Sequence, residues 1–169
     1  MKLFNKCIEV VLLHEGGLSM SKSDLGNWVG GYKTGELKGT KYGIAARWFP
    51  DEDIINLTID RAKTLYYLYY WLPMNLDGIC RDASSLEIFD FGVNAGKGRA
   101  IRTAQQLVST VKDGMMGPNT RSAINQYDGD FVADYKHARR VYYEYIATKR
   151  DNHVFLQGWL NRVNKTKFT

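Results

Sequence analysis

The chain contains few of the residues that form disulfides, metal sites and rigid turns: two cysteines, three histidines and three prolines in 169 residues. Cys7 and Cys80 form no C-x-x-C or Cys/His spacing, which excludes a disulfide framework and a structural zinc site. We expect both thiols to be buried in a reducing compartment. No apolar run approaches the ~20 residues of a membrane-spanning helix, so we expect a soluble protein without stable membrane insertion.

The composition is that of a folded domain, with 44% hydrophobic and 24% charged residues, and this excludes disordered, collagenous and coiled-coil chains. Lysine and arginine (23) outnumber aspartate and glutamate (18), and aromatic residues reach 13%. Nucleic acid, an anionic membrane surface and an acidic cell-wall polymer all fit a basic, aromatic-rich chain. The chain has no helix-turn-helix, zinc-finger or RNA-binding signature, so we expect no nucleic-acid partner.

Apolar periodicity predicts a mainly helical fold with a small irregular or β-hairpin segment near residues 18–44. The first fifteen residues faintly resemble a signal peptide, but Glu9 interrupts the apolar run and no cleavage pattern follows, so we expect a helix of the mature fold. A second helix is predicted to start near Asp51–Asp53 and to end before Pro73. Further helices are predicted over residues 85–94, 100–111 and 118–124, and a long one from about residue 131.

Local signals refine these helices. Ser84 and Glu87 have the spacing of a capping box. The apolar positions of the last helix (Phe131, Tyr135, Ala138, Tyr142 and Tyr145) recur at helical spacing and predict a packed stripe, with Arg139-Arg140 and Lys149-Arg150 on a solvated basic face. We expect residues 164–169 to fray. The boundary between an N-terminal part (1–80) and a C-terminal part (81–169), packed as one unit, is predicted in the segment 73–83.

Glu15 closes the first predicted helix in line with its apolar stripe. The negative end of the helix dipole disfavours an ionised carboxylate there, so Glu15 is suited to hold a proton. Asp24 follows nine residues later, and Thr40 lies between glycines 39 and 43. Glycoside hydrolysis needs a carboxylic acid at the leaving oxygen and a carboxylate or positioned water on the opposite face of the sugar, roles that Glu15, Asp24 and Thr40 can fill. The alternatives are an amphipathic glutamate, a turn aspartate and a structural threonine.

Residues 14–17 (His-Glu-Gly-Gly), Asp24 and residues 39–45 (Gly-Thr-Lys-Tyr-Gly-Ile-Ala) together resemble the signature of glycoside hydrolase family 108, the N-acetylmuramidases of phages and bacterial secretion systems. The spacing of Glu, Asp and a later Thr is also similar to that of phage-type lysozymes, which have a shorter link between the Asp and the Thr. Three C-terminal segments, residues 89–96, 105–107 and 113–120, resemble the peptidoglycan-associated domain that accompanies this catalytic part.

The resemblance implies a lysozyme-like, two-lobed helical fold and hydrolysis of the β-1,4 bond between N-acetylmuramic acid and N-acetylglucosamine. It implies Glu15 as general acid, with Asp24 and Thr40 positioning water or stabilising the transition state, and no cofactor. The alternatives are a lytic transglycosylase and a non-catalytic peptidoglycan-binding or secretion-accessory protein.

Four further residues are predicted to bind substrate. Trp28 and Tyr42 lie in the polar loop region and are candidates for stacking on sugar rings. Asp90 and Asn94 are four residues apart on one helix and could bind the N-acetyl groups; the alternative is a polar pair that braces the C-terminal part.

We expect a monomer of the endolysin or secretion-associated kind that acts on bacterial peptidoglycan and lyses bacteria. Without a recognisable signal peptide it would be made in the bacterial cytoplasm and reach the cell wall or periplasm through a phage holin or a secretion step.

Overall fold

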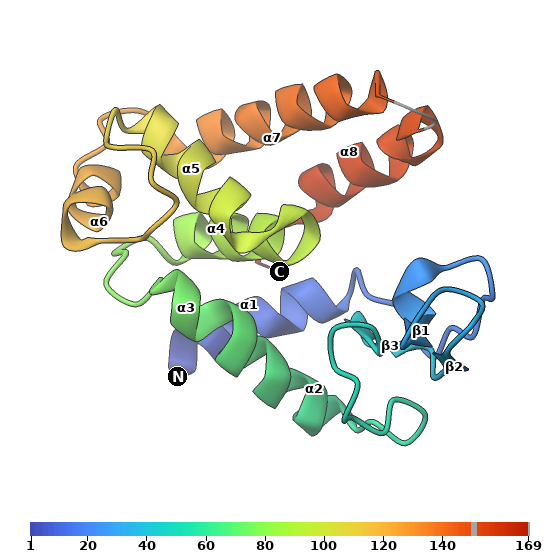
Figure 1. Cartoon of the computed structure of the whole chain (residues 1–169). Coiled ribbons are helices and arrows are strands. Elements are labelled where there is room, and N and C mark those ends of the chain that lie inside the picture. Colours follow the sequence, from blue (N-terminus) through green and yellow to red (C-terminus); the bar gives the residue numbers. More distant parts are fainter. Residues whose placement is uncertain (150–151, 169) are drawn as a thin grey trace. The chain divides into compact units, whose positions relative to one another are not determined.

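The computed structural model describes residues 1–149 and 152–168. Contacts divide the chain into two units, which are described separately (Figure 1). The hairpin unit is Val11–Tyr67, and the helical unit joins Met1–Val10 to the chain from Leu68 onward. These contact units divide the chain after Val10 and after Tyr67, whereas the predicted catalytic and peptidoglycan-associated parts divide it after residue 80.

Two short hairpins organise the hairpin unit. A 3-10 turn, η1 (Leu25–Asn27), leads into β1 (Trp28–Val29), which pairs antiparallel with β2 (Glu36–Leu37). β3 (Thr40–Lys41) pairs with β4 (Ile44–Ala45), and Thr40 lies opposite Ala45. Tyr42 and Gly43 form the connecting turn with φ of +52° and +74°, as a two-residue primed turn requires. The predicted hairpin segment is therefore confirmed.

Helices flank these hairpins in the chain. α1 (Lys2–Leu12) ends three residues before Glu15, earlier than the predicted end at residue 15. α2 (Ile59–Tyr66) begins after Thr58, whose hydroxyl accepts a hydrogen bond from Arg61 N. The predicted start near Asp51–Asp53 is wrong, because Thr58 provides the N-cap. A π-helical turn, η2 (Tyr67–Trp71), and α3 (Leu72–Met74) follow, so Pro73 lies at the beginning of a helix rather than after one.

Five α-helices form most of the described part of the helical unit after α3. α4 contacts α5 and α7, and α7 contacts α8 (Figure 1). Their bounds are α4 (Asp82–Ala95), α5 (Lys97–Leu107), α6 (Pro118–Asn125), α7 (Phe131–Ala147) and α8 (Leu156–Lys165), with a 3-10 turn, η3 (Asn152–Phe155), before α8. Phe4, Trp71 and Phe89 meet edge to face in its core, at centroid distances of 5.1–6.0 Å. Within the described ranges no helix is long and apolar enough to cross a bilayer.

The buried face of α7 differs from the predicted stripe. Its fully buried aromatic residues are Phe131, Tyr135 and Tyr143, whereas Tyr145 is 61% exposed. Arg139 occupies the buried position between Tyr135 and Tyr143, so the prediction of a solvated basic face is wrong for this residue. Arg150, predicted on the same basic face, lies outside the described residues.

Three smaller predictions also change. α4 begins at Asp82, and Glu87 binds Arg139 and Lys136 instead of completing a capping box. Thr166 is fully buried, so the C-terminal segment does not fray at this residue; Thr169 lies outside the described residues. Cys7 is buried, and burial with the nearby Asp82 carboxylate raises the pKa of its thiol to about 12, whereas Cys80 is exposed.

Candidate active site

Glu15 lies in the turn that follows α1, where its backbone N–H donates to Leu12 O at 3.2 Å. Its half-buried side chain lies against the turn of the β3–β4 hairpin. A Cβ atom added to Gly43 would lie 2.6 Å from Glu15 Oε2 and would overlap the hydroxyl of Tyr66. The Glu15 carboxyl, the Tyr66 hydroxyl and the Gly43 backbone therefore meet at one point of the hairpin unit.

Two hydrogen bonds of the Tyr42 backbone fix the groups around the Glu15 carboxyl. The Tyr66 hydroxyl, at the end of α2, donates to Tyr42 O at 3.0 Å, and Tyr66 is only 1% exposed. The Tyr42 N–H donates to Gly16 O at 3.0 Å, which joins the hairpin turn to the residue after Glu15. The carboxyl is thus positioned by backbone contacts and a buried ring, an arrangement that limits its motion.

Gly43→Ala tests this positioning. The substitution adds a methyl group beside the Glu15 carboxyl and strains a backbone with φ of +74°, so we expect about a 10²-fold loss of hydrolytic activity from the displaced carboxyl. Gly30→Ala is the matched control, because Gly30 has a similar φ of +81° but no atom within 4 Å of the added Cβ. Gly43→Ala should also lose more thermal stability than Gly30→Ala, because its methyl group overlaps the buried Tyr66 hydroxyl, so activity is compared at a temperature at which both variants are folded. Equal activity of the two variants would contradict the positioning role of Gly43.

Asp24 and Thr40 approach each other beside Gly26 in the hairpin unit. A Cβ atom added to Gly26 would lie 3.2 Å from Asp24 Oδ1 and 3.8 Å from Thr40 Oγ1. Asp24 is exposed and caps η1, accepting a hydrogen bond from Gly26 N at 2.8 Å through Oδ1. Its Oδ2 makes no hydrogen bond within the described chain, so one carboxylate oxygen is available to a ligand or water.

The Thr40 hydroxyl is oriented by Asn27. Oγ1 of Thr40 donates to Asn27 Oδ1 at 2.6 Å, and Asn27 Nδ2 donates to Ser21 O at 2.9 Å. Because its proton is engaged by Asn27, the Thr40 oxygen offers only lone pairs to a ligand. Asn27 is fully buried and is not among the residues that the sequence predicts for the site. The signal available was a lone asparagine before Trp28 in a loop of Gly, Ser and Lys.

Trp28 and Tyr42, the two aromatic residues predicted to stack on sugar rings, both lie in the hairpin unit. Tyr42, half-buried, forms the tip of the β3–β4 hairpin, and the Lys41 ammonium lies 5.5 Å from its ring centroid. Trp28, also half-buried, donates from Nε1 to Lys22 O at 3.2 Å and meets Tyr32 edge to face. Tyr42 adjoins the Glu15 contact through its backbone, whereas Trp28 adjoins Asn27 in the chain.

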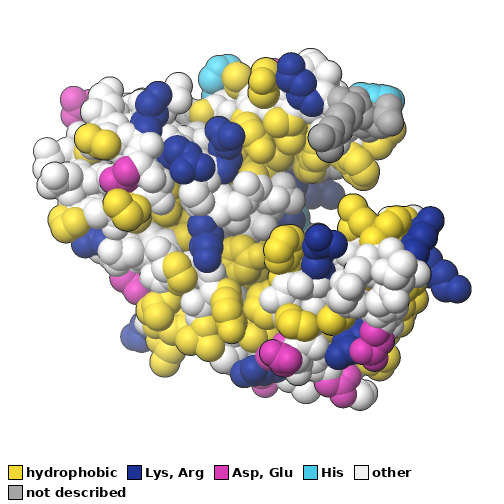
Figure 2. Space-filling view, viewed as in Figure 1, with side chains coloured by type: hydrophobic (Ala, Val, Ile, Leu, Met, Phe, Trp, Pro, Cys, Tyr) yellow, Lys and Arg dark blue, Asp and Glu magenta, His cyan; other side chains and the backbone are white. Residues whose placement is uncertain are grey.

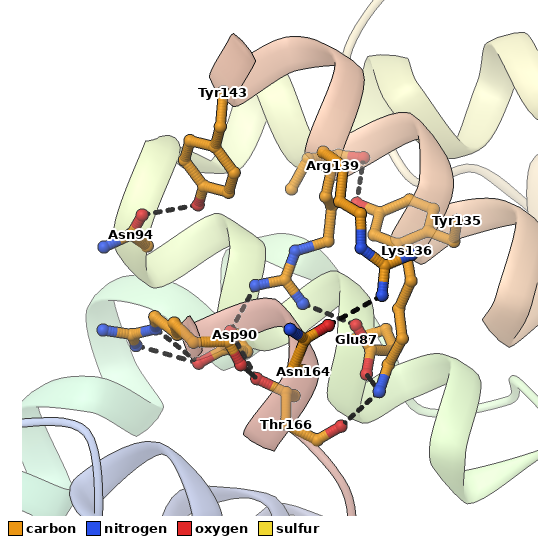
Figure 3. Close-up of polar contacts among 12 residues, drawn as sticks. Glu87, Asp90, Asn94, Tyr135, Lys136, Arg139, Tyr143, Asn164 and Thr166 are labelled. Carbon is orange, nitrogen blue, oxygen red and sulfur yellow. Dashed lines mark hydrogen bonds and ion pairs between the residues drawn. The ribbon is translucent and has the colours of Figure 1, made fainter. Parts of the chain in front are cut away.

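Asp90 belongs to a buried ion-pair network in the helical unit (Figure 3). Its side chain is 0% exposed and binds Arg139 at 2.5 Å, Arg162 at 2.8 Å and the Thr166 hydroxyl at 3.1 Å. Buried carboxylates of this kind are already saturated with partners. The position of Asp90 therefore favours the bracing alternative over sugar binding.

Asn94 is exposed, but its Oδ1 accepts a hydrogen bond from the Tyr143 hydroxyl at 2.5 Å (Figure 3). This contact joins α4 to α7, so Asn94 also has a bracing role in the helical unit. Among the described residues, no three His, Cys, Asp or Glu side chains gather as metal ligands would.

Comparison with known families identifies two regions of the chain. Residues 8–96, more than half of the chain, match the family model described as Glycosyl hydrolase 108. The chain belongs to the glycosyl hydrolase 108 family. Residues 99–164 match a second model, described as Predicted Peptidoglycan domain. This family member is therefore a glycoside hydrolase that acts on peptidoglycan.

A solved structure, that of SagA from Brucella abortus, has the same fold as this glycosyl hydrolase 108 chain, with a TM-score of 0.76 at 24% sequence identity. The match covers 96% of this chain and 90% of that one, and it confirms the predicted mainly helical, lysozyme-like fold. No curated protein matches the chain.

Proposed function

We propose that the protein is an N-acetylmuramidase that cleaves the β-1,4 bond between N-acetylmuramic acid and N-acetylglucosamine, with Glu15 as the general acid. The observation that carries the proposal is the contact of the Glu15 carboxyl with Tyr66 and the Gly43 turn, in the same unit as the Asp24–Thr40 pair. A positioned carboxylic acid can protonate the leaving oxygen while a second group acts from the opposite face of the sugar.

Asp24 and Thr40 are proposed to position the attacking water. An ionised aspartate only accepts hydrogen bonds, and the Thr40 oxygen also only accepts because its proton goes to Asn27. A water bound to both would donate its two hydrogens to them and present a lone pair in another direction. Such a water is pre-oriented for attack on the anomeric carbon, which lowers the entropic part of the barrier.

Thr40→Val tests the water-binding role, because it keeps the shape of the side chain and removes the acceptor oxygen. We expect kcat on purified peptidoglycan to fall about 10²-fold with little change in KM. Thr64→Val is the matched control, since the Thr64 hydroxyl also donates a hydrogen bond, to Asp60 O, but lies on the exposed face of α2. Wild-type kcat in Thr40→Val would refute the role of Thr40.

Trp28 and Tyr42 are proposed to stack on the sugar rings of the glycan, since both are half-buried aromatic side chains of the unit that carries Glu15. Asp90 and Asn94 are left out of the proposed site because their oxygen atoms already bind Arg139, Arg162 and Tyr143.

A further inference from the structure

The surface between α5 and α7, in the helical unit, is hollowed by a groove of about 540 Å³. One wall is formed by Arg99, Thr103 and Gln106 of α5, and the other by residues of α7 that include Tyr142 and Tyr145. A second hollow of about 220 Å³ shares Arg99, Thr103 and Gln106 and extends to Arg102 and Lys112. We call the two together the α5–α7 groove.

The aromatic wall of this groove reaches from the core of the helical unit to the surface. Tyr142 packs edge to face on the buried Phe91, with ring centroids 5.5 Å apart, whereas the fully buried aromatic residues of α7 are Phe131, Tyr135 and Tyr143. Tyr145 is 61% exposed and Val141 is 50% exposed, while Tyr142 is half-buried. Exposed aromatic and aliphatic side chains that gather at a groove are typical of binding surfaces.

The cations of the groove lack acidic partners. The Arg99 guanidinium lies 4.9 Å from the Tyr142 ring centroid, and no Asp or Glu lines either hollow. Arg99, Arg102 and Lys112 form no ion pair within the described chain, whereas Arg139, Arg162 and Lys136 of the same unit are all paired with acids. Figure 2 shows Lys and Arg side chains gathered over α5 beside hydrophobic side chains of α7.

We propose that the α5–α7 groove binds the peptide-bearing strand of peptidoglycan. The carboxylates of the stem peptide would pair with Arg99, Arg102 and Lys112, and a sugar ring or apolar peptide side chain would lie on Tyr142 and Tyr145. Cations beside aromatic faces suit such a ligand because it carries negative charge next to flat, partly apolar surfaces. The inference rests on the proposed function only in taking the same polymer as ligand, since the groove contains none of the residues assigned to hydrolysis.

The test is binding to purified sacculi, measured by co-sedimentation in a Glu15→Gln background so that the ligand is not consumed. The double variant Arg99→Gln/Arg102→Gln should weaken binding about 10-fold, and more salt should reduce the difference. Lys2→Gln/Lys165→Gln is the matched control, because it removes the same charge from exposed positions of the helical unit outside the groove. Equal binding by the two double variants would overturn the proposal.

A soluble ligand tests the chemistry. A disaccharide-tetrapeptide should shift the amide NMR signals of α5 and α7 and bind more tightly than a peptide-free chitin oligosaccharide. Equal affinity for both, or tighter binding of single-stranded DNA, would overturn the proposal. With Glu15 restored, Arg99→Gln/Arg102→Gln should cleave short soluble glycans at the wild-type rate. If the wild type binds through the groove but cleaves no glycan, the proposed muramidase function is refuted and the proposed binding site is supported.

Discussion

Glu15→Gln should abolish the loss of turbidity of purified cell walls while leaving wall binding intact. Glutamine keeps the size and shape of the side chain, but its amide has no acidic proton to transfer to the leaving oxygen. General acid catalysis contributes about 10²–10⁴-fold to rate, so kcat should fall by at least about 100-fold. The change should leave the fold unaltered, since Glu15 is half-buried at a turn and not in the core of either unit.

Two variants make this result specific. Glu9→Gln carries the same substitution on an exposed position of α1 and should lyse walls at the wild-type rate. Glu15→Asp keeps the carboxyl but withdraws it by about one methylene, so it should lose much of the activity through misplacement. Equal lysis by wild type and Glu15→Gln would refute the assignment of Glu15.

Asp90→Asn should strongly destabilise the helical unit. Asp90 is fully buried and accepts bonds from Arg139, Arg162 and Thr166, so its neutralisation leaves the buried Arg139 and the partly buried Arg162 with too few acids. Breaking a buried pair by removing one charge costs about 3–5 kcal/mol of unfolding free energy. Urea unfolding followed by circular dichroism measures the difference.

Asp82→Asn is the matched control for that measurement. It lies on the same helix, α4, and pairs with Lys6 at 3.2 Å, but both side chains are exposed. Exposed pairs contribute at most about 1 kcal/mol, so Asp82→Asn should unfold nearly as the wild type does. Similar losses in the two variants would show that the Asp90 network does not stabilise the helical unit.

The cost of Asp90→Asn should also depend on pH. Burial opposes ionisation of Asp90, but Arg162 and Arg139 outweigh it and hold the pKa of this carboxyl below its usual value. Such a carboxyl stabilises the fold above its unfolded pKa, about 3.9, and its contribution is lost as the pH falls through the folded value. The difference between wild type and Asp90→Asn should therefore be constant near neutral pH and shrink below about pH 4.

The hairpin unit could be predicted well because its signals are local. Glu15, Asp24 and Thr40 were selected from a glycine-flanked motif within 26 residues, and the Tyr42-Gly43 turn follows from neighbouring residues. What the motif did not supply was Asn27. Its side chain reaches Thr40 thirteen residues away, and a single asparagine in a loop carries no periodic signal.

The helical unit was predicted less completely because its polar contacts join distant residues. Arg139 reaches Glu87 and Asp90 across 52 and 49 positions, and Thr166 reaches Asp90 across 76. Helical periodicity places an arginine on one face of its helix, but it does not reveal an acidic residue on another helix that neutralises the buried charge. For the same reason the sequence predicts a substrate contact for Asp90, whose partners Arg139, Arg162 and Thr166 lie at least 49 positions further along the chain.

The most direct test of the muramidase assignment is the chemical identity of the new chain ends. Purified peptidoglycan is digested with the wild-type protein, the products are reduced with borohydride, and the muropeptides are identified by mass spectrometry. For a muramidase we expect products that end in reduced N-acetylmuramic acid. Products that end in reduced N-acetylglucosamine, or in 1,6-anhydro-muramic acid, would contradict it.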